Sequence, residues 1–401
     1  THKSLNFQAD KDTTGRKSMR PQSFRSTFFI VFALIGTLIS VQAQANTVPR
    51  APQIDARGYL LMDAASGNII VEHNADQRLP PASLTKMMTA YIAEAELQKG
   101  NISEQDMAPI SVQAWKMGGS RMFVREGTRV SVGELLRGII IQSGNDASVA
   151  MAEFIAGSED AFADLMNQHA RRLGMNDSHF VNSTGWPAEN HYTTARDMAL
   201  LARAITRDFP EHYDIYAEKE YTYNGITQQN RNLLLWRDPS VDGLKTGHTE
   251  EAGYCLVSSA KKDGMRLITV VMGTDSESAR ARESQKLLTY GFRFFETYKA
   301  YSAGDILDTV DVWMGESKQL RLGLAEDLVL TIPRDSHESL KAEITVNPQL
   351  KAPIAQGQQY GTVTVRQNND VLMEKPLVAL ENIEEAGIFT KLWHHVLLFF
   401  K

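Results

Sequence analysis

The strongest constraint on the fold is a lysine placed inside an apolar helical pattern. The segment PPASLTKMMTAYI (80–92) has apolar residues at the i, i+3, i+4 and i+7 spacing of a buried helical stripe that begins near Ser83. Lys86 follows Ser83 by one helical turn and therefore lies on the same side of the helix. A cation in the first turn opposes the helix dipole, and among methionines it loses hydration. Such an unfavourable position indicates a chemical role for the amine.

A buried amine beside a serine can activate the hydroxyl. Serine is a weak nucleophile until a neighbouring group removes its proton. Burial lowers the pKa of a lysine towards neutrality, so the Lys86 amine can act as the general base for Ser83. The S-x-x-K pattern alone is weak, because residues 258–261 also match it and read as a strand running into a turn. A serine active site therefore needs further parts.

Two further motifs supply such parts. Ser-Gly-Asn at 143–145 interrupts two apolar helical segments and can present polar groups to a cleft. The same triplet at 66–68 lies in a predicted hairpin turn, where these three residues are common turn formers. In DGLKTGHT (242–249), Lys245 and Thr246 on an edge strand offer a cation and a hydroxyl, and the next glycine lets a ligand backbone approach.

Composition argues against several classes of function. The net charge of −6 leaves no electrostatic footprint for a nucleic-acid partner. The single cysteine, Cys255, lies in an apolar strand pattern and is predicted to be a core thiol. No Cys/His cluster has zinc-ligand spacing and no phosphate-binding G-x-x-x-x-G-K-[ST] loop occurs. We therefore expect no metal and no cofactor.

The N-terminus has the pattern of an export signal. Arg20 and Arg25 precede an apolar run over 28–41, which is followed by the small-x-small site Ala-Gln-Ala at 43–45. A membrane span needs roughly 20 apolar residues, so an uncleaved anchor is the weaker interpretation. We expect residues 1–45 to be an upstream extension and a secretory signal peptide, and the mature chain to work outside the cytoplasm.

The middle of the chain predicts a sheet flanked by helices over residues 46–297. The segments 58–74 and 253–273 each read as two strands around a turn, and the second contains an Asp-Gly hairpin signal. Residues 83–208 have a helical pattern, and 277–299 read as one amphipathic helix.

The C-terminal part changes character. Short alternating runs joined by Gly, Pro and Asn turns predict a small β-rich domain over 298–382. In the last segment, 383–401, six apolar residues of GIFTKLWHHVLLFFK fall on one helical face. A helix of about 13 residues spans about 20 Å, too short for a hydrocarbon core of ~30 Å. We expect it to lie in the membrane surface; the alternative is that it packs on its own protein.

The order of the motifs is more specific than any one of them. S-x-x-K at 83–86, S-x-N at 143–145 and K-T-G at 245–247 form the set found in penicillin-binding proteins and class A β-lactamases. From about residue 50 onward the chain resembles the low-molecular-mass penicillin-binding proteins of the D-alanyl-D-alanine carboxypeptidase family, also in stretches such as YNGITQQNRNLLLW and LLTYGFRFFET. The resemblance implies an α/β (α+β) β-lactamase/transpeptidase-like domain, with an antiparallel sheet flanked by helices and an all-α lobe. A small all-β C-terminal domain and a terminal amphipathic helix would follow it.

The resemblance also implies a mechanism. Ser83 attacks the carbonyl between two terminal D-alanines of a peptidoglycan stem peptide, and Lys86 takes its proton. Ser143 and Lys245 relay a proton to the leaving amine, and Asn145 holds the substrate amide. Water then hydrolyses the acyl-enzyme, whereas β-lactams trap it. The enzyme would work at the periplasmic face of the inner membrane.

Further binding residues follow from the same resemblance. Thr246 and Arg280 grip the terminal carboxylate, beside Gly247. The backbone N–H groups of Ser83 and His248 form the oxyanion hole, whose aimed donors stabilise the tetrahedral intermediate.

Other readings stay open on the residues alone. A class A β-lactamase needs a glutamate in an E-x-x-L-N setting, and the closest string, PAENHY (187–192), does not fit. A cell-wall endopeptidase of the same fold and a non-catalytic binding module are further alternatives. The chain also departs from many relatives at Trp186-Pro187, where they have leucine, so its substrate preference is open.

Overall fold

The described chain forms two compact units. The computed structural model describes residues 2–6 and 48–389. The first unit comprises residues 49–301 together with 327–334. The second comprises the remaining described residues, chiefly 302–326 and 335–389.

A five-stranded antiparallel sheet is the centre of the first unit. Its strands, in spatial order, are β3 (Ile69–His73), β2 (Gly58–Asp63), β10 (Met265–Thr274), β9 (Gly253–Lys262) and β8 (Val241–Thr249). The β9–β10 turn carries Asp263 and Gly264, both with positive φ, as a two-residue hairpin turn requires. Both predicted hairpins are confirmed, and the K-T-G motif lies on the edge strand β8, as expected.

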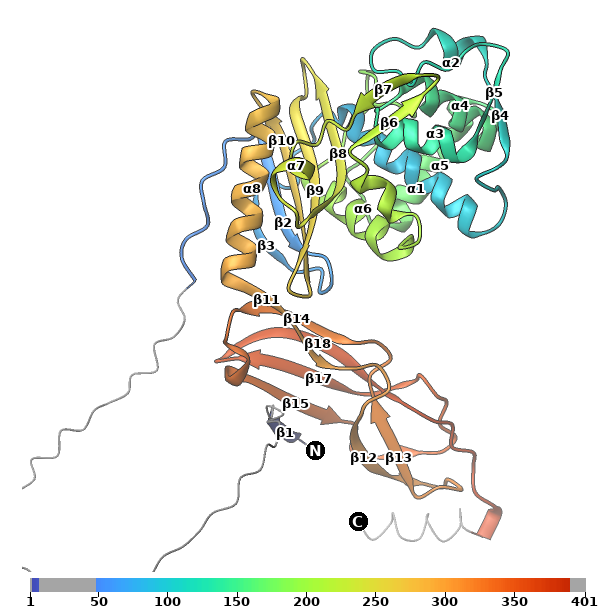
Figure 1. Cartoon of the computed structure of the whole chain (residues 1–401). Helices are drawn as coiled ribbons and strands as arrows, with labels where there is room; N and C mark the ends of the chain where they lie inside the picture. The colour runs from blue at the N-terminus through green and yellow to red at the C-terminus, as the bar shows by residue number, and fades with distance from the viewer. Residues whose placement is uncertain (1, 7–47, 390–401) are drawn as a thin grey trace, which may run out of the picture. The chain divides into compact units, whose positions relative to one another are not determined.

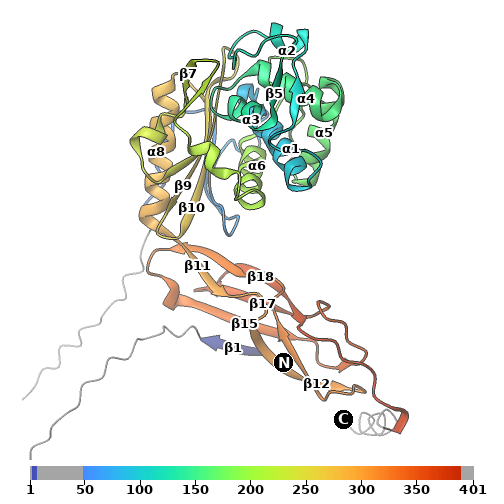
Figure 2. The same ribbon diagram turned by 45° about the vertical axis from the view of Figure 1, so that its right-hand side comes forward.

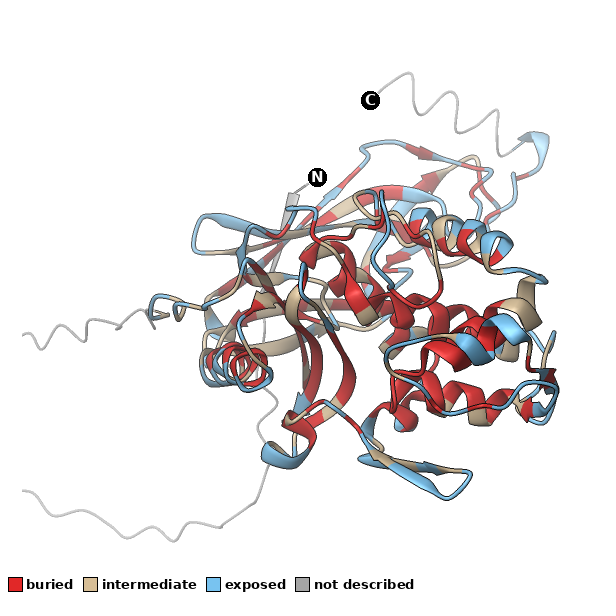
Figure 3. Ribbon diagram, turned by 90° about the horizontal axis from the view of Figure 1, so that it is seen from above, coloured by how far each residue is buried: buried red, intermediate tan, exposed pale blue. Residues whose placement is uncertain are grey.

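Helices cover both faces of this sheet. Figure 1 shows α8 (Glu277–Phe294) on one face and α6 (Ala195–Asp208) with the helical lobe on the other. The remaining helices of the lobe are α1 (Lys86–Gln98), α2 (Val112–Lys116), α3 (Val132–Ile140), α4 (Asn145–Ala156) and α5 (Glu159–Arg172). Buried residues run through the sheet strands and the inward faces of the helices (Figure 3). The predicted sheet flanked by helices, with an all-α lobe, is confirmed.

Short elements complete the first unit. They are η1 (Ala82–Thr85), η2 (Tyr213–Ala217), α7 (Leu234–Arg237) and the strand pairs β4 (Met107–Pro109) with β5 (Arg129–Ser131) and β6 (Glu220–Tyr223) with β7 (Ile226–Gln229). The β4–β5 and β6–β7 pairs lie apart from the central sheet and border the helical lobe (Figure 1).

The predicted helix over 277–299 is too long. The α-helix ends at Phe294, and β11 (Phe295–Tyr301) pairs antiparallel with β14 (Leu328–Pro333). The segment FETYKAY is rich in aromatic residues, which favour strands. Its partner strand lies about thirty residues downstream, so a local reading of helical periodicity does not see it.

The second unit is an all-β sheet, as predicted. Its strands, in spatial order, are β1 (His2–Asn6), β15 (Leu340–Val346), β17 (Gln359–Gln367), β18 (Asp370–Ala379), β13 (Gln319–Gly323), β12 (Ile306–Trp313) and β16 (Leu350–Lys351). Figure 2 shows β15, β17 and β18 side by side. Alternate residues of β15 are buried, which places the core on one face of the sheet. A short 3₁₀ turn, η3 (His337–Ser339), precedes β15.

Both chain ends carried predictions that fall largely outside the described residues. The signal sequence proposed within 1–45 and the amphipathic helix proposed within 383–401 depend on residues 7–47 and 390–401. Within the described part of the chain, no helix is both long and apolar enough to cross a membrane.

Candidate active site

Ser83 lies in a tight turn that leads into α1. The sequence predicted a helix start near Ser83; instead residues 82–85 form a 3₁₀ turn, and the α-helix begins at Lys86. Ala82 has φ +47, a conformation uncommon for a residue with a side chain. The bend at Ala82 places Ser83 just before the N-terminus of α1 rather than within the helix. The Ser83 side chain is half-buried and borders the cleft.

Two glycines hold the backbone of this turn from either side. A Cβ on Gly185, which has φ +83, would lie 1.7 Å from the carbonyl oxygen of Ala82. A Cβ on Gly247 of β8 would lie 3.2 Å from both the amide nitrogen of Leu84 and the carbonyl oxygen of Pro81. The loop at Gly185 and the edge strand β8 therefore pack directly on the backbone of the turn, which fixes the position of the serine.

The Lys86 amine is fully buried and has three polar neighbours. Its Nζ lies 3.1 Å from Ser83 Oγ, 2.7 Å from Asn145 Oδ1 and 2.6 Å from the Thr184 carbonyl oxygen. A neutral amine has two N–H groups and one lone pair. Because Asn145 and Thr184 offer only acceptors, the two N–H groups go to them and the lone pair is left facing the serine hydroxyl. This is the arrangement that a general base requires.

Burial also gives this amine a suitable pKa. Loss of hydration, and next the positive charge of Arg231, lower the pKa of Lys86 from 10.5 to about 7. The carboxylates of Asp146 and Glu159 act in the opposite direction but are weaker influences. Near neutral pH, a large fraction of the Lys86 amine is therefore unprotonated.

A second serine–lysine pair comes from the other two motifs. Ser143 lies between α3 and α4 with φ +59, and Lys245 Nζ lies 3.0 Å from its Oγ. The same Nζ is 3.1 Å from the carbonyl oxygen of Thr246. Burial, and next the positive charge of Lys86, hold the pKa of Lys245 well below its usual value. Two buried amines with lowered pKa values thus border one cleft, where proton transfer can occur on either side of a substrate.

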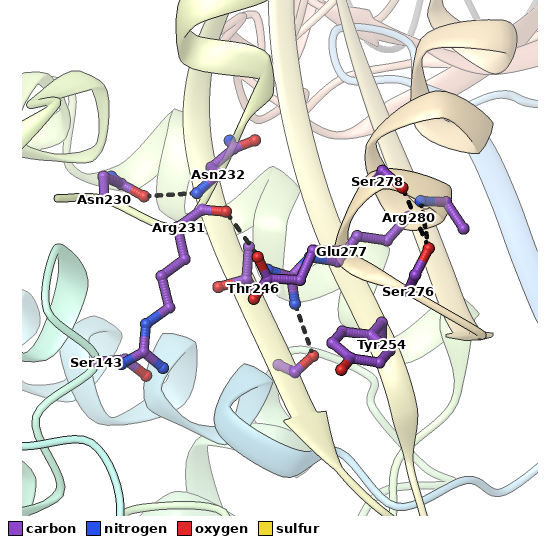
Figure 4. Close-up of polar contacts among 12 residues, drawn as sticks. Ser143, Asn230, Arg231, Asn232, Thr246, Tyr254, Ser276, Glu277, Ser278 and Arg280 are labelled. Atoms are coloured by element: carbon purple, nitrogen blue, oxygen red, sulfur yellow. Dashed lines mark hydrogen bonds and ion pairs between the residues drawn. The ribbon is translucent and has the colours of Figure 1, made fainter.

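Arg280 lies under the edge strand. Its side chain, 2% exposed, reaches from α8 to the Gly247 carbonyl oxygen at 3.3 Å and the Arg231 carbonyl oxygen at 3.4 Å. Figure 4 shows this side chain beside Tyr254, whose ring centroid lies 5.6 Å from the Arg280 Cζ atom. The partly exposed Glu277 lies 3.6 Å away and leaves most of the positive charge uncompensated.

Arg231 adds a second cation that the sequence analysis missed. Its guanidinium extends towards Ser143 (Figure 4) and donates to Ser120 Oγ at 2.7 Å. Together with Arg280 it makes the cleft positive, which attracts a carboxylate. No local pattern marks Arg231, because it comes from the loop between β7 and α7 and reaches the cleft only after the chain has folded.

The edge strand offers a backbone donor at His248. In an antiparallel pair, the N–H and C=O groups of alternate residues face the same side of a strand. The Thr246 carbonyl accepts a bond from Lys245 Nζ, so it faces the cleft, and the His248 amide two residues on faces the same way. The His248 ring instead stacks on Tyr254, with centroids 3.9 Å apart. The His248 N–H can thus serve a ligand at this edge of the sheet.

The predicted site residues therefore come together from four parts of the chain. The S-x-x-K, S-x-N and K-T-G motifs and α8 meet at one cleft. The structure adds three contributions that the motifs do not contain: the Thr184 carbonyl, the Gly185 contact and the Arg231 charge. The unusual Trp186 directly follows this loop segment, is 50% exposed, and packs on Gly118 and Gly119. Among the described residues, no group of His, Cys, Asp or Glu is arranged to hold a metal ion.

Comparison with known families gives matches to both units. The D-alanyl-D-alanine carboxypeptidase family of S11 peptidases matches residues 44–276. The C-terminal domain of penicillin-binding protein 5 matches residues 295–385. The first match contains all three motifs, and the second begins at β11.

Individual relatives are similar over most of their length. The D-alanyl-D-alanine carboxypeptidase DacA of Escherichia coli (strain K12) is 46% identical over 88% of this chain and 90% of its own. DacC of the same strain is 45% identical over 89% and 91%. The crystal structure of penicillin binding protein 5 from Haemophilus influenzae is 42% identical, with a TM-score of 0.82 over 84% of this chain and 100% of its own.

Proposed function

Because the chain belongs to the D-alanyl-D-alanine carboxypeptidase family, we propose that it removes the terminal D-alanine from peptidoglycan stem pentapeptides through an acyl-enzyme on Ser83. The cleft geometry supports this assignment: a nucleophile with its base, a second serine–lysine pair and a cationic end are arranged around one space. A β-lactam, which presents a strained amide and a carboxylate to the same groups, acylates the same serine.

Acylation begins with proton transfer to Lys86. As the amine takes the hydroxyl proton, Ser83 Oγ bonds to the carbonyl carbon of the penultimate D-alanine. The N–H groups of Ser83 and His248 donate to the oxygen that becomes negative, a contribution of several kcal/mol when donors are correctly aimed. The substrate carboxylate lies against the positive end of the cleft, near Thr246 and Arg280.

Collapse of the intermediate breaks the C–N bond. The proton that Lys86 took from Ser83 passes to Lys245 and then through the Ser143 hydroxyl to the leaving nitrogen, which leaves both amines neutral again; Lys245 Nζ lies 3.0 Å from the Ser143 oxygen. D-Alanine departs, and Asn145 holds the amide of the acyl portion. Water then attacks the ester, and Lys86 accepts a proton from that water and returns one to Ser83 Oγ, which restores the free enzyme.

The observation that carries this proposal is the 3.1 Å contact between Lys86 Nζ and Ser83 Oγ, with both N–H groups of the neutral amine held by the carbonyl oxygens of Asn145 and Thr184. Ser83→Ala should abolish both D-alanine release and labelling by fluorescent penicillin. Ser258→Ala, in the second S-x-x-K pattern on β9, is the matched control and should retain both. Labelling that survives in Ser83→Ala would identify another nucleophile and refute the proposal.

We also propose that the enzyme is exported and held at the membrane surface by its C-terminal segment. The apolar run over 28–41 with its small-residue cleavage pattern supports export, and the apolar face of residues 387–401 supports interfacial binding. Deleting residues 388–401 should move the protein from the membrane fraction to the soluble fraction without loss of penicillin labelling. A truncated protein that stays with the membrane would refute the anchor.

A further inference from the structure

A second hollow lies on the far side of the loop that borders the cleft. It has a volume of about 280 Å³. We call it the arginine hollow and define it by six of its lining residues: Trp115, Arg121, Phe123, Arg125, Asn224 and Ile226. They come from α2, from the loop before β5, and from the β6–β7 hairpin, which all belong to the first unit.

The loop over residues 118–124 is a wall shared by the cleft and the hollow. On the cleft side, Asn145 Nδ2 donates to the Gly118 carbonyl at 2.8 Å, and the same side chain contacts Lys86. On the hollow side, the next residue, Asp146, accepts bonds from three successive amides, at 2.8 Å from Met122, 2.8 Å from Phe123 and 3.1 Å from Val124. Consecutive Cα atoms are about 3.8 Å apart. The hollow therefore adjoins the candidate active site directly.

The wall is firmly held, so the hollow is preformed. Gln228 of β7 donates to the Arg121 carbonyl at 2.9 Å, which ties the hairpin to the loop. Arg231 donates to Ser120 Oγ at 2.7 Å from the cleft side. A ligand entering the hollow would pay little ordering entropy, and preformed sites of this kind are typical of binding pockets.

The side chains of the hollow combine apolar surface with unpaired donors. Trp115, Phe123 and Ile226 are 42%, 38% and 41% exposed, an unusual concentration of large apolar groups at one solvent-facing place. Arg121 lies over the Phe123 ring at 5.0 Å, and no ion pair found among the described residues involves Arg121 or Arg125. A ligand with one apolar face and a rim of hydrogen-bonding oxygens matches this combination.

We propose that the arginine hollow binds a saccharide ring of the peptidoglycan strand whose stem peptide is being cleaved. A pyranose has a face of C–H groups for Trp115 or Phe123 and a rim of oxygens for the arginines and Asn224. A peptide carboxylate alone would explain the arginines but would leave three exposed apolar side chains unused. The volume of the arginine hollow is close to the lower end of the range for ligand pockets, about 300–1,000 Å³. The hollow therefore suits one sugar ring rather than a long chain.

The position of the hollow fits the reach of the substrate. Four stem residues separate the scissile carbonyl from the sugar, and an extended peptide spans at most ~3.3–3.6 Å per residue, or about 13–14 Å in total. The hollow begins one residue beyond Asn145, well within that reach. This inference rests on the proposed function, because the stem peptide must occupy the cleft for its sugar to reach the hollow.

The test compares three substrates: an N-acylated tripeptide ending in D-alanyl-D-alanine, the free stem pentapeptide, and the disaccharide pentapeptide. The variants are Trp115→Ala and Arg125→Gln, and Trp236→Ala is the control because Trp236 is similarly exposed, at 44%, outside the hollow. Loss of an aromatic contact should lower kcat/KM for the disaccharide pentapeptide by roughly two- to tenfold. Turnover of the tripeptide and the rate of labelling by fluorescent penicillin should be unchanged, which also shows that the variants are folded.

Two results would overturn the inference. An equal loss on the free pentapeptide would mean that the hollow binds a peptide carboxylate rather than a sugar. Unchanged kcat/KM on all three substrates would mean that the arginine hollow binds no part of the peptidoglycan strand that carries the stem peptide. Failure of the proposed function looks different, because the unmodified enzyme would then release no D-alanine even from the tripeptide.

Discussion

Removing the positive charge of Arg231 should raise the pH at which Ser83 becomes reactive. The reason is that Lys86 acts as a base only when it is neutral, and Arg231 is the second-largest cause of its lowered pKa. In Arg231→Gln the Lys86 ammonium no longer faces that cation, so the amine keeps its proton to higher pH. The acylation rate at neutral pH should fall although no group of the serine–lysine pair has changed.

The magnitude follows from the Lys86 pKa. A fall from 10.5 to about 7 corresponds to about 5 kcal/mol against the ammonium, and it raises the neutral fraction at pH 7 from about 1 in 3,000 to about one half. Burial is the largest cause of the lowered pKa, and the substitution leaves it in place. Because Arg231 is exposed and solvent screens its charge, its share is roughly 1 kcal/mol, so the inflection should rise by a little under one pH unit.

The assay is the second-order rate of acylation by fluorescent penicillin, measured from about pH 5 to about pH 9. In the unmodified enzyme the rate should increase about tenfold per pH unit below an inflection near pH 7 and level off above it, because the neutral base is present above the pKa and lost below it. Arg171→Gln, which removes an exposed arginine of α5, is the matched control and should leave the profile in place.

Two results would refute this reasoning. A rate that is already maximal at pH 5 would mean that no group with a pKa near 7 must lose a proton before acylation. An inflection near 7 that does not move in Arg231→Gln would mean that the titrating group is not Lys86, or that Arg231 does not act on its charge. Either outcome would require a different base.

Three further predictions concern the framework of the site. Gly185→Ala should prevent folding or abolish penicillin labelling, because the new Cβ would meet the Ala82 carbonyl. Gly157→Ala is the control, because Gly157 has the same left-handed backbone but open space around the new Cβ, and this variant should stay active. An active Gly185→Ala would contradict the proposed contact. Arg280→Gln should raise KM for a D-alanyl-D-alanine peptide at least tenfold while far-ultraviolet circular dichroism stays unchanged, and an unaltered kcat/KM would remove its proposed carboxylate role. Glu94→Gln should raise the free energy of unfolding at pH 7 by about 2–3 kcal/mol. Burial raises the pKa of the Glu94 carboxyl in the folded protein to about 8. Stability therefore falls as pH rises above the pKa of this carboxyl in the unfolded chain, near 4.5, and the glutamine variant avoids this loss. Urea denaturation at pH 5 and pH 7 checks this prediction, and an equal effect at both values would contradict it.

The sequence predicted the local elements well. Hairpins at 58–74 and 253–273 depend on neighbouring residues and a turn, so pattern and turn chemistry are sufficient to place them. The sequence also placed Ser83 and Lys86 one turn apart, although Ser83 lies in a 3₁₀ turn and the α-helix begins only at Lys86. The helix over 277–299 was predicted too long because its last residues pair with β14, a partner that no local window contains.

By itself, the sequence determined which residue types are present, their order and their spacing along the chain. It could not determine that the Thr184 carbonyl would take one proton of the Lys86 amine, that Arg231 would add its charge, or that Gly185 would press on Ala82. These contacts join segments about 100 to 150 residues apart, and they form only when the burial of the whole core brings α4, β8 and the 182–187 loop together. The lowered pKa of Lys86 has the same origin, because removal of water from an amine is a property of the packed interior and not of the residues beside it in the chain.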